Sequence, residues 1–323
     1  MSEQRKTVLV TGAAGALARA VIRRLLPDHD IVAVDFRKRA DIEGLTNTYK
    51  VDFNKRGFED LFRRHQIDGV IHVGRIGTHE SNLTGRYNSN VLGTQRLLNL
   101  CVKYEVRQVV VLSTFFVYGA HAQNPTLLDE EAPLKASGLT HDLIDTVELE
   151  NLCNVYLWKH PELHITVLRP CHIAGPGVRN SMSRLLSSHL APTLLGFSPM
   201  MQFIHVEDMA EALFLAWNKV KPGIFNVAPK DWVGYQDALL ACGCTRVPLV
   251  SIPGLIPHQI AKILNLKSFP SHLVNYFKYP VIIDGSAFAE QFGFKPRFKL
   301  DQIFRYYREK KRREDLLSMF REA

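Results

Sequence analysis

The sequence predicts an α/β fold: a doubly wound parallel sheet with helices on both faces, followed by a small, mostly helical C-terminal lobe. Short apolar runs alternate with segments of helical periodicity along the chain. The runs at residues 8–10, 31–34 and 109–112 are continuously apolar, as expected of strands that are buried on both faces. A chain of 323 residues is long enough for one large domain and a smaller lobe.

The first strand, turn and helix lie within residues 7–26. The apolar run is followed by Gly12, which permits a tight turn, and by Gly15, which lets the backbone approach a pyrophosphate at the helix N-terminus. Ala18 takes the third small position and still allows the helix to pack closely on the sheet. This combination of strand, glycine turn and helix predicts a dinucleotide-binding domain of the Rossmann type.

The end of the second strand indicates which dinucleotide binds. Asp35 follows the apolar run at residues 31–34, about 20 residues past the glycine turn. A carboxylate there accepts hydrogen bonds from ribose hydroxyls and repels a 2′-phosphate, which favours NAD. Arg37, Lys38 and Arg39 follow at once and could hold a 2′-phosphate, so NADP remains the less favoured alternative.

The next two predicted strands are followed by residues that could contact or accommodate the dinucleotide. Asp52 comes after a short strand at 49–51 and could meet an adenine amino group. Gly74, after the strand at 70–73, lets a ligand pass close to the backbone. Residues 91–104 have the apolar spacing of a helix with one buried face.

The composition excludes several classes of protein. No stretch approaches the ~20 uninterrupted apolar residues of a membrane-spanning helix, and the short polar start leaves no room for a signal peptide. The five cysteines are scattered, and Cys242 and Cys244 lack zinc-site spacing, so we expect reduced thiols, no metal and a cytoplasmic location. Of the net charge of +8, the tail from Lys295 contributes +5, from ten basic and five acidic residues.

Six motifs resemble one family, in that family's order. They are TGAAGALA with Asp35 and Asp52 behind it, VIHVGR, NVLGT, LSTFFVYG, LRPCHIAGPG and QFIHVEDMAEAL, and they span most of residues 7–227. The sequence is thereby identified as a member of the extended short-chain dehydrogenases/reductases, the branch of the NAD-dependent epimerases and dehydratases of sugar nucleotides. The resemblance implies a homodimer, with the helix near residues 90–104 in its interface.

The resemblance also implies two parts with different tasks. Residues 1–178 would form mainly the NAD-binding domain and residues 179–323 mainly the substrate lobe, with residues 203–228 returning to the first part. The residues expected to contact the cofactor are Gly12, Ala14, Gly15, Ala16, Leu17, Asp35, Arg37, Asp52, Phe53, Val73, Gly74, Arg75, Asn90, Leu112, Ser113, Pro170 and His172. Those expected to contact the substrate are Thr114, Phe115, Arg179 and Arg184.

The sequence departs from the family at the catalytic positions. Thr114 stands four residues before the tyrosine of the VYG element, where relatives have a Ser or Thr that binds a substrate oxygen. The family's Tyr-x-x-x-Lys, whose tyrosine transfers the proton, is missing. If residues 148–150 align with the family's acids, Asp142 falls at the tyrosine position and Thr146 at the lysine position. The candidate proton acceptors are then His141, Asp142 or a water, since an imidazole exchanges protons near neutral pH.

Several of these polar residues have a structural alternative. His141 would equally suit the solvated start of a helix predicted over residues 139–156. His172 could line the substrate, or it could be a satisfied histidine at a strand end. Asp208 is predicted to cap the helix over residues 209–217 rather than to act in catalysis.

The segment from Met182 to Met201 would reach over the substrate, and it carries few polar groups. A nucleotide diphosphate needs cations, for which Arg179 and Arg184 are available. The apolar remainder of the segment would instead suit a hydrophobic substrate or a subunit contact.

Two functions from different classes follow. The first, which we favour, is an NAD-dependent epimerase, dehydratase or reductase that acts on a nucleotide sugar or a related hydroxy or keto compound. The second is a non-catalytic dinucleotide-binding scaffold or sensor, because the cofactor half is intact and the proton-transfer half is missing. The basic tail at residues 305–323 could then bind a protein partner, RNA or an anionic membrane surface, although a solvated helix is the preferred interpretation.

Overall fold

A computed structural model describes residues 5–53, 55–77, 82–251, 255–263, 269 and 273–322. Its centre is a seven-stranded, wholly parallel sheet in the order β11-β6-β5-β4-β1-β2-β3. The strands are β1 (Lys6–Thr11), β2 (His29–Asp35), β3 (Asn47–Lys50), β4 (Gly69–His72), β5 (Gln108–Leu112), β6 (His164–Pro170) and β11 (Gly223–Val227). The predicted doubly wound parallel sheet is confirmed.

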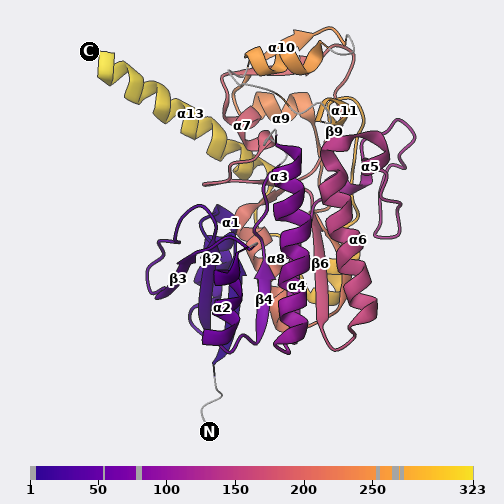
Figure 1. Cartoon of the computed structure of the whole chain (residues 1–323). Coiled ribbons are helices and arrows are strands. Elements are labelled where there is room, and N and C mark those ends of the chain that lie inside the picture. Colours follow the sequence, from indigo (N-terminus) through magenta and orange to yellow (C-terminus); the bar gives the residue numbers. More distant parts are fainter. Residues whose placement is uncertain are drawn as a thin grey trace.

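Helices cover both faces of this sheet (Figure 1). One face carries α2 (Arg56–Arg64), α4 (Gly93–Lys103) and α6 (Ile144–Lys159), and the other carries α1 (Ala16–Leu25) and α8 (Val206–Lys219). Along β1, Val8 and Val10 belong to the core under α1 and α8, whereas Leu9 belongs to the core under α2, α4 and α6. Because both faces are buried, the strand is apolar at consecutive positions.

The turn after β1 and the segment after β4 are in backbone contact. Gly12 has a φ of +67°, in the left-handed region, and a Cβ placed on it would lie 2.6 Å from the Cα of Gly74. A Cβ on Gly74 would lie 2.9 Å from the backbone nitrogen of Gly12. Both positions therefore require glycine. They lie where the chain crosses from β3 to the other side of β1, which is the switch point at which such sheets bind ligands.

A mostly helical lobe lies beyond the carboxyl ends of the strands, in the upper part of Figure 1. Its elements are α7 (Ser181–Ser187), β8 (Leu190–Leu194), β9 (Met200–Met201), β12 (Val233–Gly234), α9 (Tyr235–Ala241), β13 (Thr245–Leu249), α10 (Ile256–Ile263) and α11 (Leu273–Tyr276). Within the lobe, β8 pairs with β13 and β9 pairs with β12. A third pair joins β7 (His172–Ala174) to β10 (Phe203–His205).

Two helices begin differently from the predictions. The helix predicted over residues 139–156 is interrupted: α5 (Ala136–Leu139) and a 3₁₀ turn (His141–Leu143) precede α6. The cause is Thr140, whose backbone is extended and whose hydroxyl accepts a hydrogen bond from the N–H of Asp142 at 3.2 Å. The helix predicted over residues 91–104 is entered through α3 (Leu83–Tyr87) and a π-turn (Asn88–Leu92) before α4.

The chain closes with α12 (Ser286–Phe292) and α13 (Leu300–Glu322). Buried Tyr307 and Lys311 hold the first half of α13 against the lobe, where the Lys311 Nζ donates to the carbonyl oxygen of Leu186 at 3.0 Å. From Arg312 to Ser318 the side chains are exposed, and this half projects from the body in Figure 1. Within the described ranges, no helix has the length and apolar character needed to cross a membrane.

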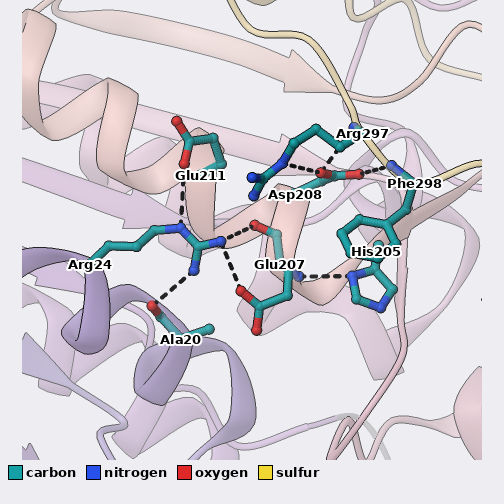
Figure 2. A network of polar contacts seen from close by, with 8 residues as sticks. All are labelled: Ala20, Arg24, His205, Glu207, Asp208, Glu211, Arg297 and Phe298. Atoms are coloured by element: carbon teal, nitrogen blue, oxygen red, sulfur yellow. Dashed lines mark hydrogen bonds and ion pairs between the residues drawn. The ribbon is translucent and has the colours of Figure 1, made fainter.

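Figure 2 shows how α8 is tied to α1 and to the segment before α13. Arg24 of α1 forms ion pairs with Glu207 at 2.8 Å and with Glu211 at 3.3 Å. The carboxylate of Asp208, which is 1% exposed, accepts hydrogen bonds from the backbone N–H groups of Arg297 and Phe298 at 3.1 and 3.0 Å. Asp208 therefore anchors a segment that lies about 90 residues later in the sequence.

The prediction that Asp208 caps the helix is wrong. The N-cap of α8 is His205, whose Nδ1 accepts a hydrogen bond from the N–H of Glu207 at 3.2 Å. The ring of His205 also stacks on Phe298, with centroids 3.8 Å apart. The helix begins earlier than expected, so Asp208 lies in its first turn and its carboxylate is available for the tertiary contact.

The D208A substitution would leave two backbone N–H groups without acceptors at a buried position. We expect a loss of about 3 kcal/mol in the free energy of unfolding, because an unsatisfied buried donor costs about 1–3 kcal/mol. Denaturant unfolding measures this loss. D301A is the matched control, since Asp301 is 61% exposed in an i, i+4 pair with Arg305, and such pairs contribute about 0.5 kcal/mol or less. Equal losses in the two variants would contradict the anchoring function of Asp208.

Candidate active site

A cavity of about 520 Å³ opens at the carboxyl ends of β5 and β6. Its sheet side is formed by the ends of β2, β5 and β6, the segment after β4, and α6. Its lobe side is formed by α7, α11 and the 3₁₀ turn at Phe115–Tyr118. The predicted site residues that line it are Arg37, Arg75, Leu112, Ser113, Thr114, Phe115, Pro170, His172 and Arg179. The structure thus brings together residues from three of the six predicted motifs, VIHVGR, LSTFFVYG and LRPCHIAGPG.

The glycine turn and the N-terminus of α1, predicted to hold the cofactor through Gly12, Ala14, Gly15, Ala16 and Leu17, are not among the residues that line this cavity. Gly15 is the N-cap of α1 and makes no side-chain capping bond, and the first turn contains no acidic residue. The N–H groups of Ala16 and Leu17 at this end are therefore suited to an anion, with the helix dipole in their favour. The close approach of Gly12 to Gly74 keeps side chains out of the space above the turn. These features fit a dinucleotide pyrophosphate.

Asp35 is held at the end of β2 with its carboxylate buried. One oxygen accepts a hydrogen bond from the N–H of Ala14 at 3.2 Å, and the other accepts from the N–H of Arg37 at 2.9 Å. The guanidinium of Arg37 pairs with the same carboxylate at 3.2 Å and is itself 59% exposed. The acid predicted to hold the ribose hydroxyls is therefore fixed beside the glycine turn, with one cation on its outer side.

Three other residues predicted to bind the cofactor, Asp52, Phe53 and Val73, are not among the residues that line the cavity. Phe53 is 7% exposed and packs against the rings of Phe58 and His72, with centroids 4.9 and 5.6 Å apart. Asp52 precedes it, and Val73 packs against the core beside Gly74.

Asn90, also predicted to bind the cofactor, is buried and holds the chain after β4. Its Oδ1 accepts from the N–H of Ile76 at 2.8 Å, and its Nδ2 donates to the Ile76 carbonyl at 2.9 Å. The same Nδ2 donates to Asp145 of α6 at 2.6 Å. Asn90 therefore fixes the segment that carries Arg75.

Thr114 lies on the cavity wall, immediately after β5. It is the N-cap of the 3₁₀ turn, and its Oγ1 accepts a hydrogen bond from the N–H of Phe116 at 3.3 Å. The preceding Ser113 donates to the buried carboxylate of Glu150, which pairs with Arg169 at 2.6 Å. This buried contact holds the strand end in place, so that the Thr114 hydroxyl faces a preformed wall.

Arg75 places a guanidinium beside Thr146 on the cavity wall. Its Nη2 donates to the Oγ1 of Thr146 at 2.8 Å, and both residues line the cavity. Burial lowers the pKa of the Arg75 guanidinium, whereas the nearby carboxylates of Asp145 and Glu150 raise it. A guanidinium starts from so high a pKa that it stays protonated at neutral pH.

His141 and Asp142 lie away from the cavity. His141 lines a second hollow with Arg86 and Asp145, whose side chains form a buried ion pair at 2.5 Å. The backbone carbonyl of Asp142 accepts a hydrogen bond from the same guanidinium. Arg184 also lies outside the described cavity lining, with its side chain exposed on α7.

The lobe contributes wall residues that sequence analysis did not single out. Leu185 of α7, Leu273 and Tyr276 of α11, and Phe277 behind it all line the cavity. No spacing in the sequence links them to the glycine turn or to Thr114, because the lobe brings α7 and α11 together only by tertiary packing. The one available signal was the apolar composition of these segments.

His172 lies among aromatic rings on the cavity wall. Its ring centroid is 4.7 Å from that of Phe115 and 5.5 Å from that of Phe203. Burial lowers the pKa of His172 to about 3, so the imidazole is neutral at physiological pH. Burial likewise lowers the pKa of His72 to about 4; its ring nitrogens lie 2.8 and 2.9 Å from the hydroxyls of Thr11 and Thr94.

Because these two histidines are neutral when buried, we expect the folded protein to lose stability in acid. As the pH falls below about 6.5, the unfolded chain binds protons that the folded chain does not, so stability decreases. Each histidine should remove on the order of 2 kcal/mol of unfolding free energy by about pH 4.5. Denaturant unfolding from pH 7.5 to 4.5 measures the slope. H172F, which cannot titrate, should show a shallower slope than H258Q, whose histidine is exposed; identical slopes would contradict a neutral buried His172.

Fold and cavity together define a class: a dinucleotide-binding α/β protein with a ligand cavity at the switch point of its sheet. The family model described as "NAD dependent epimerase/dehydratase family" matches residues 8–228. The chain belongs to this family, which confirms both the resemblance in its motifs and NAD as the predicted cofactor.

Individual relatives are similar at low identity. The UDP-glucose 4-epimerase of Halalkalibacterium halodurans is 25% identical, over 73% of this chain and 79% of the relative. An uncharacterized protein of Mycobacterium tuberculosis is 23% identical, over 94% of this chain and 83% of the relative. Among solved structures, MoeE5 in complex with UDP-glucuronic acid and NAD has a TM-score of 0.76 at 22% identity, covering 95% of this chain and 99% of MoeE5. The UDP-glucose 4-epimerase of Thermotoga maritima has the same TM-score at 18% identity, covering 96% and 99%.

Proposed function

We propose that this chain is an NAD-dependent oxidoreductase that acts at a hydroxyl or carbonyl carbon of a nucleotide sugar or a related compound, without Tyr-x-x-x-Lys. Residues 1–178 would mainly hold the cofactor, and residues 179–323 would mainly enclose the substrate. The observation that carries the proposal is the contact of Arg75 with Thr146 in the cavity that Thr114 also lines. It supplies a fixed positive charge where the family's lysine is missing.

The residues of the sheet side fit NAD. The N–H groups at the start of α1 would bind the pyrophosphate, and Asp35 would accept hydrogen bonds from the adenosine ribose. Arg37 on the outer side of Asp35 keeps NADP as the less favoured alternative. When bound, NAD accepts or returns the hydride.

The chain's own residues would orient and stabilise the reacting oxygen. The Thr114 hydroxyl would donate a hydrogen bond to the substrate oxygen, and the Arg75 guanidinium would stabilise negative charge on it during the reaction. Arg75 keeps its proton, so it acts by charge and not as an acid or base.

The proton would pass to water. Within the described cavity wall, the side chains that could exchange protons have pKa values far from neutral: burial lowers that of His172 to about 3 and raises that of Tyr276. His141 and Asp142 remain the alternative acceptors predicted from the sequence. Water is favoured over either, because His141 lines the second hollow and Asp142 is not among the residues that line the cavity.

The R75A variant tests the assigned charge. We expect turnover to fall about 10²-fold, as when a charge-stabilising donor is removed, with R75K recovering part of the loss. NADH absorbance measures turnover and calorimetry measures NAD binding. R305A is the control, because Arg305 is 56% exposed on α13. Turnover in R75A equal to that in the unmodified protein would refute the assignment.

The T114A variant tests substrate orientation separately. Its turnover should fall by a similar factor of about 10², while its affinity for NAD stays unchanged, because the hydroxyl is assigned to the substrate. T114S keeps the hydroxyl and should retain most activity. A fall in NAD affinity in T114A, with T114S equally impaired, would assign Thr114 a structural function instead.

A non-catalytic dinucleotide sensor or scaffold is the second candidate. One observation that favours a sensor or scaffold is that the described cavity wall has no side chain with a pKa near neutral that could act as acid or base. Another is the exposed second half of α13, which could dock on a protein, RNA or a membrane surface. NAD binding without NADH formation, over the substrates tested, would support this candidate over the enzyme.

A further inference from the structure

We infer that the lobe side of the cavity receives the apolar body of a hydroxy or keto substrate, and not the diphosphate of a nucleotide sugar. This inference rests on the proposed function, since it assigns the sheet side to the cofactor. It narrows the substrate class to neutral compounds whose reacting oxygen sits on a hydrocarbon or aromatic body.

Apolar side chains line the lobe side of the cavity. Phe115 and Phe116 meet Tyr276 with ring centroids 5.9 and 4.7 Å apart, which forms one aromatic wall. Met182 and Leu185 of α7 also line this side, and they are 7% and 1% exposed. Burying an apolar group between such walls is favourable, whereas burying an unpaired anion is costly.

Most polar side chains on this side already form hydrogen bonds within the protein. The phenol of Tyr276 donates to the carbonyl oxygen of Phe116 at 2.9 Å. The amide of Asn180 is used at both ends: its Nδ2 donates to Ile173 at 2.8 Å and its Oδ1 accepts from Ser183 at 2.7 Å. The single O–H of Tyr276 could not donate to a phosphate without breaking its bond to Phe116, and of the Asn180 amide only the second N–H of Nδ2 is left to donate.

The cations are placed unfavourably for a diphosphate. Arg179 lines the lobe side but is exposed, and Arg184 is exposed and is not among the described lining residues. The other two guanidinium groups on the wall belong to the sheet side, where Arg37 pairs with Asp35 and Arg75 bonds to Thr146. Among the described residues that line the lobe side, a diphosphate would therefore find one exposed cation, Arg179, for its two negative charges.

The test is a calorimetric titration of the full chain with 4-phenyl-2-butanone, a neutral ketone with an apolar body, and with UDP-glucose. Each titration is made with and without saturating NAD. We expect the ketone to bind at least about tenfold more tightly than UDP-glucose, because the wall cannot pair a diphosphate. Tighter binding of UDP-glucose, or no measurable binding of the ketone, overturns the inference.

The same titrations distinguish this inference from the proposed function. Ketone binding in a protein that does not bind NAD would support the inference and contradict the proposed function. NAD binding together with tighter binding of UDP-glucose than of the ketone would support the proposed function and contradict the inference.

A variant locates the ketone on the lobe side. M182Q keeps the length of the side chain and adds a polar amide, so we expect its ketone affinity to fall about tenfold with no gain for UDP-glucose. L195Q is the control, because Leu195 belongs to the same lobe and is 55% exposed. Thermal unfolding checks that both variants are folded. Ketone affinity unchanged in M182Q overturns the assignment to this side.

Discussion

A buried ion pair lies under the cavity, between Glu150 of α6 and Arg169 of β6. The N–O distance is 2.6 Å, and neither side chain is more than 3% exposed. Two buried charges are tolerated only where further hydrogen bonds satisfy them. Here Ser113 donates to the carboxylate, and the guanidinium donates to the Tyr118 hydroxyl at 2.8 Å. The pair thus joins β5, β6, α6 and the 3₁₀ turn, and the position of Thr114 depends on it.

A second buried set of contacts aligns the cation of the site. Asn90 ties the chain after β4 to Asp145 of α6, and Asp145 in turn pairs with Arg86. Arg75 and Thr146 are the residues next to these contacts, so their hydrogen bond is supported from both sides. Here the charge comes from the segment after a strand, and α6 contributes only a hydroxyl.

The parts of the site that could be predicted are those whose chemistry is local. Gly12, Gly15 and Asp35 act through a turn, a helix end and a strand end within one unit of strand, turn and helix, so their spacing carries the signal. The family resemblance named Ser113, Thr114 and His172 as site residues, and all three line the cavity. They come together because parallel strands place their carboxyl ends at one edge of a sheet.

The parts that could not be predicted depend on contacts between distant segments. Asp208 was expected to cap its own helix, but its partners lie about 90 residues later, where no local pattern reports them. The break at Thr140, which removes His141 from α6, depends on one side-chain hydrogen bond that competes with the helix.

The sequence by itself determined the parallel sheet, the dinucleotide turn and the absence of any tyrosine between Gly119 and Tyr156, where the family's Tyr-x-x-x-Lys is expected. Hydrophobic periodicity and glycine conformation act over a few residues, so these features follow from the order of residues alone. Only the tertiary structure decided that Arg75 donates a hydrogen bond to Thr146, and that apolar side chains of α7 and α11 line one side of the cavity. Such contacts are set by how helices and lobe pack, and packing joins residues that no sequence spacing relates.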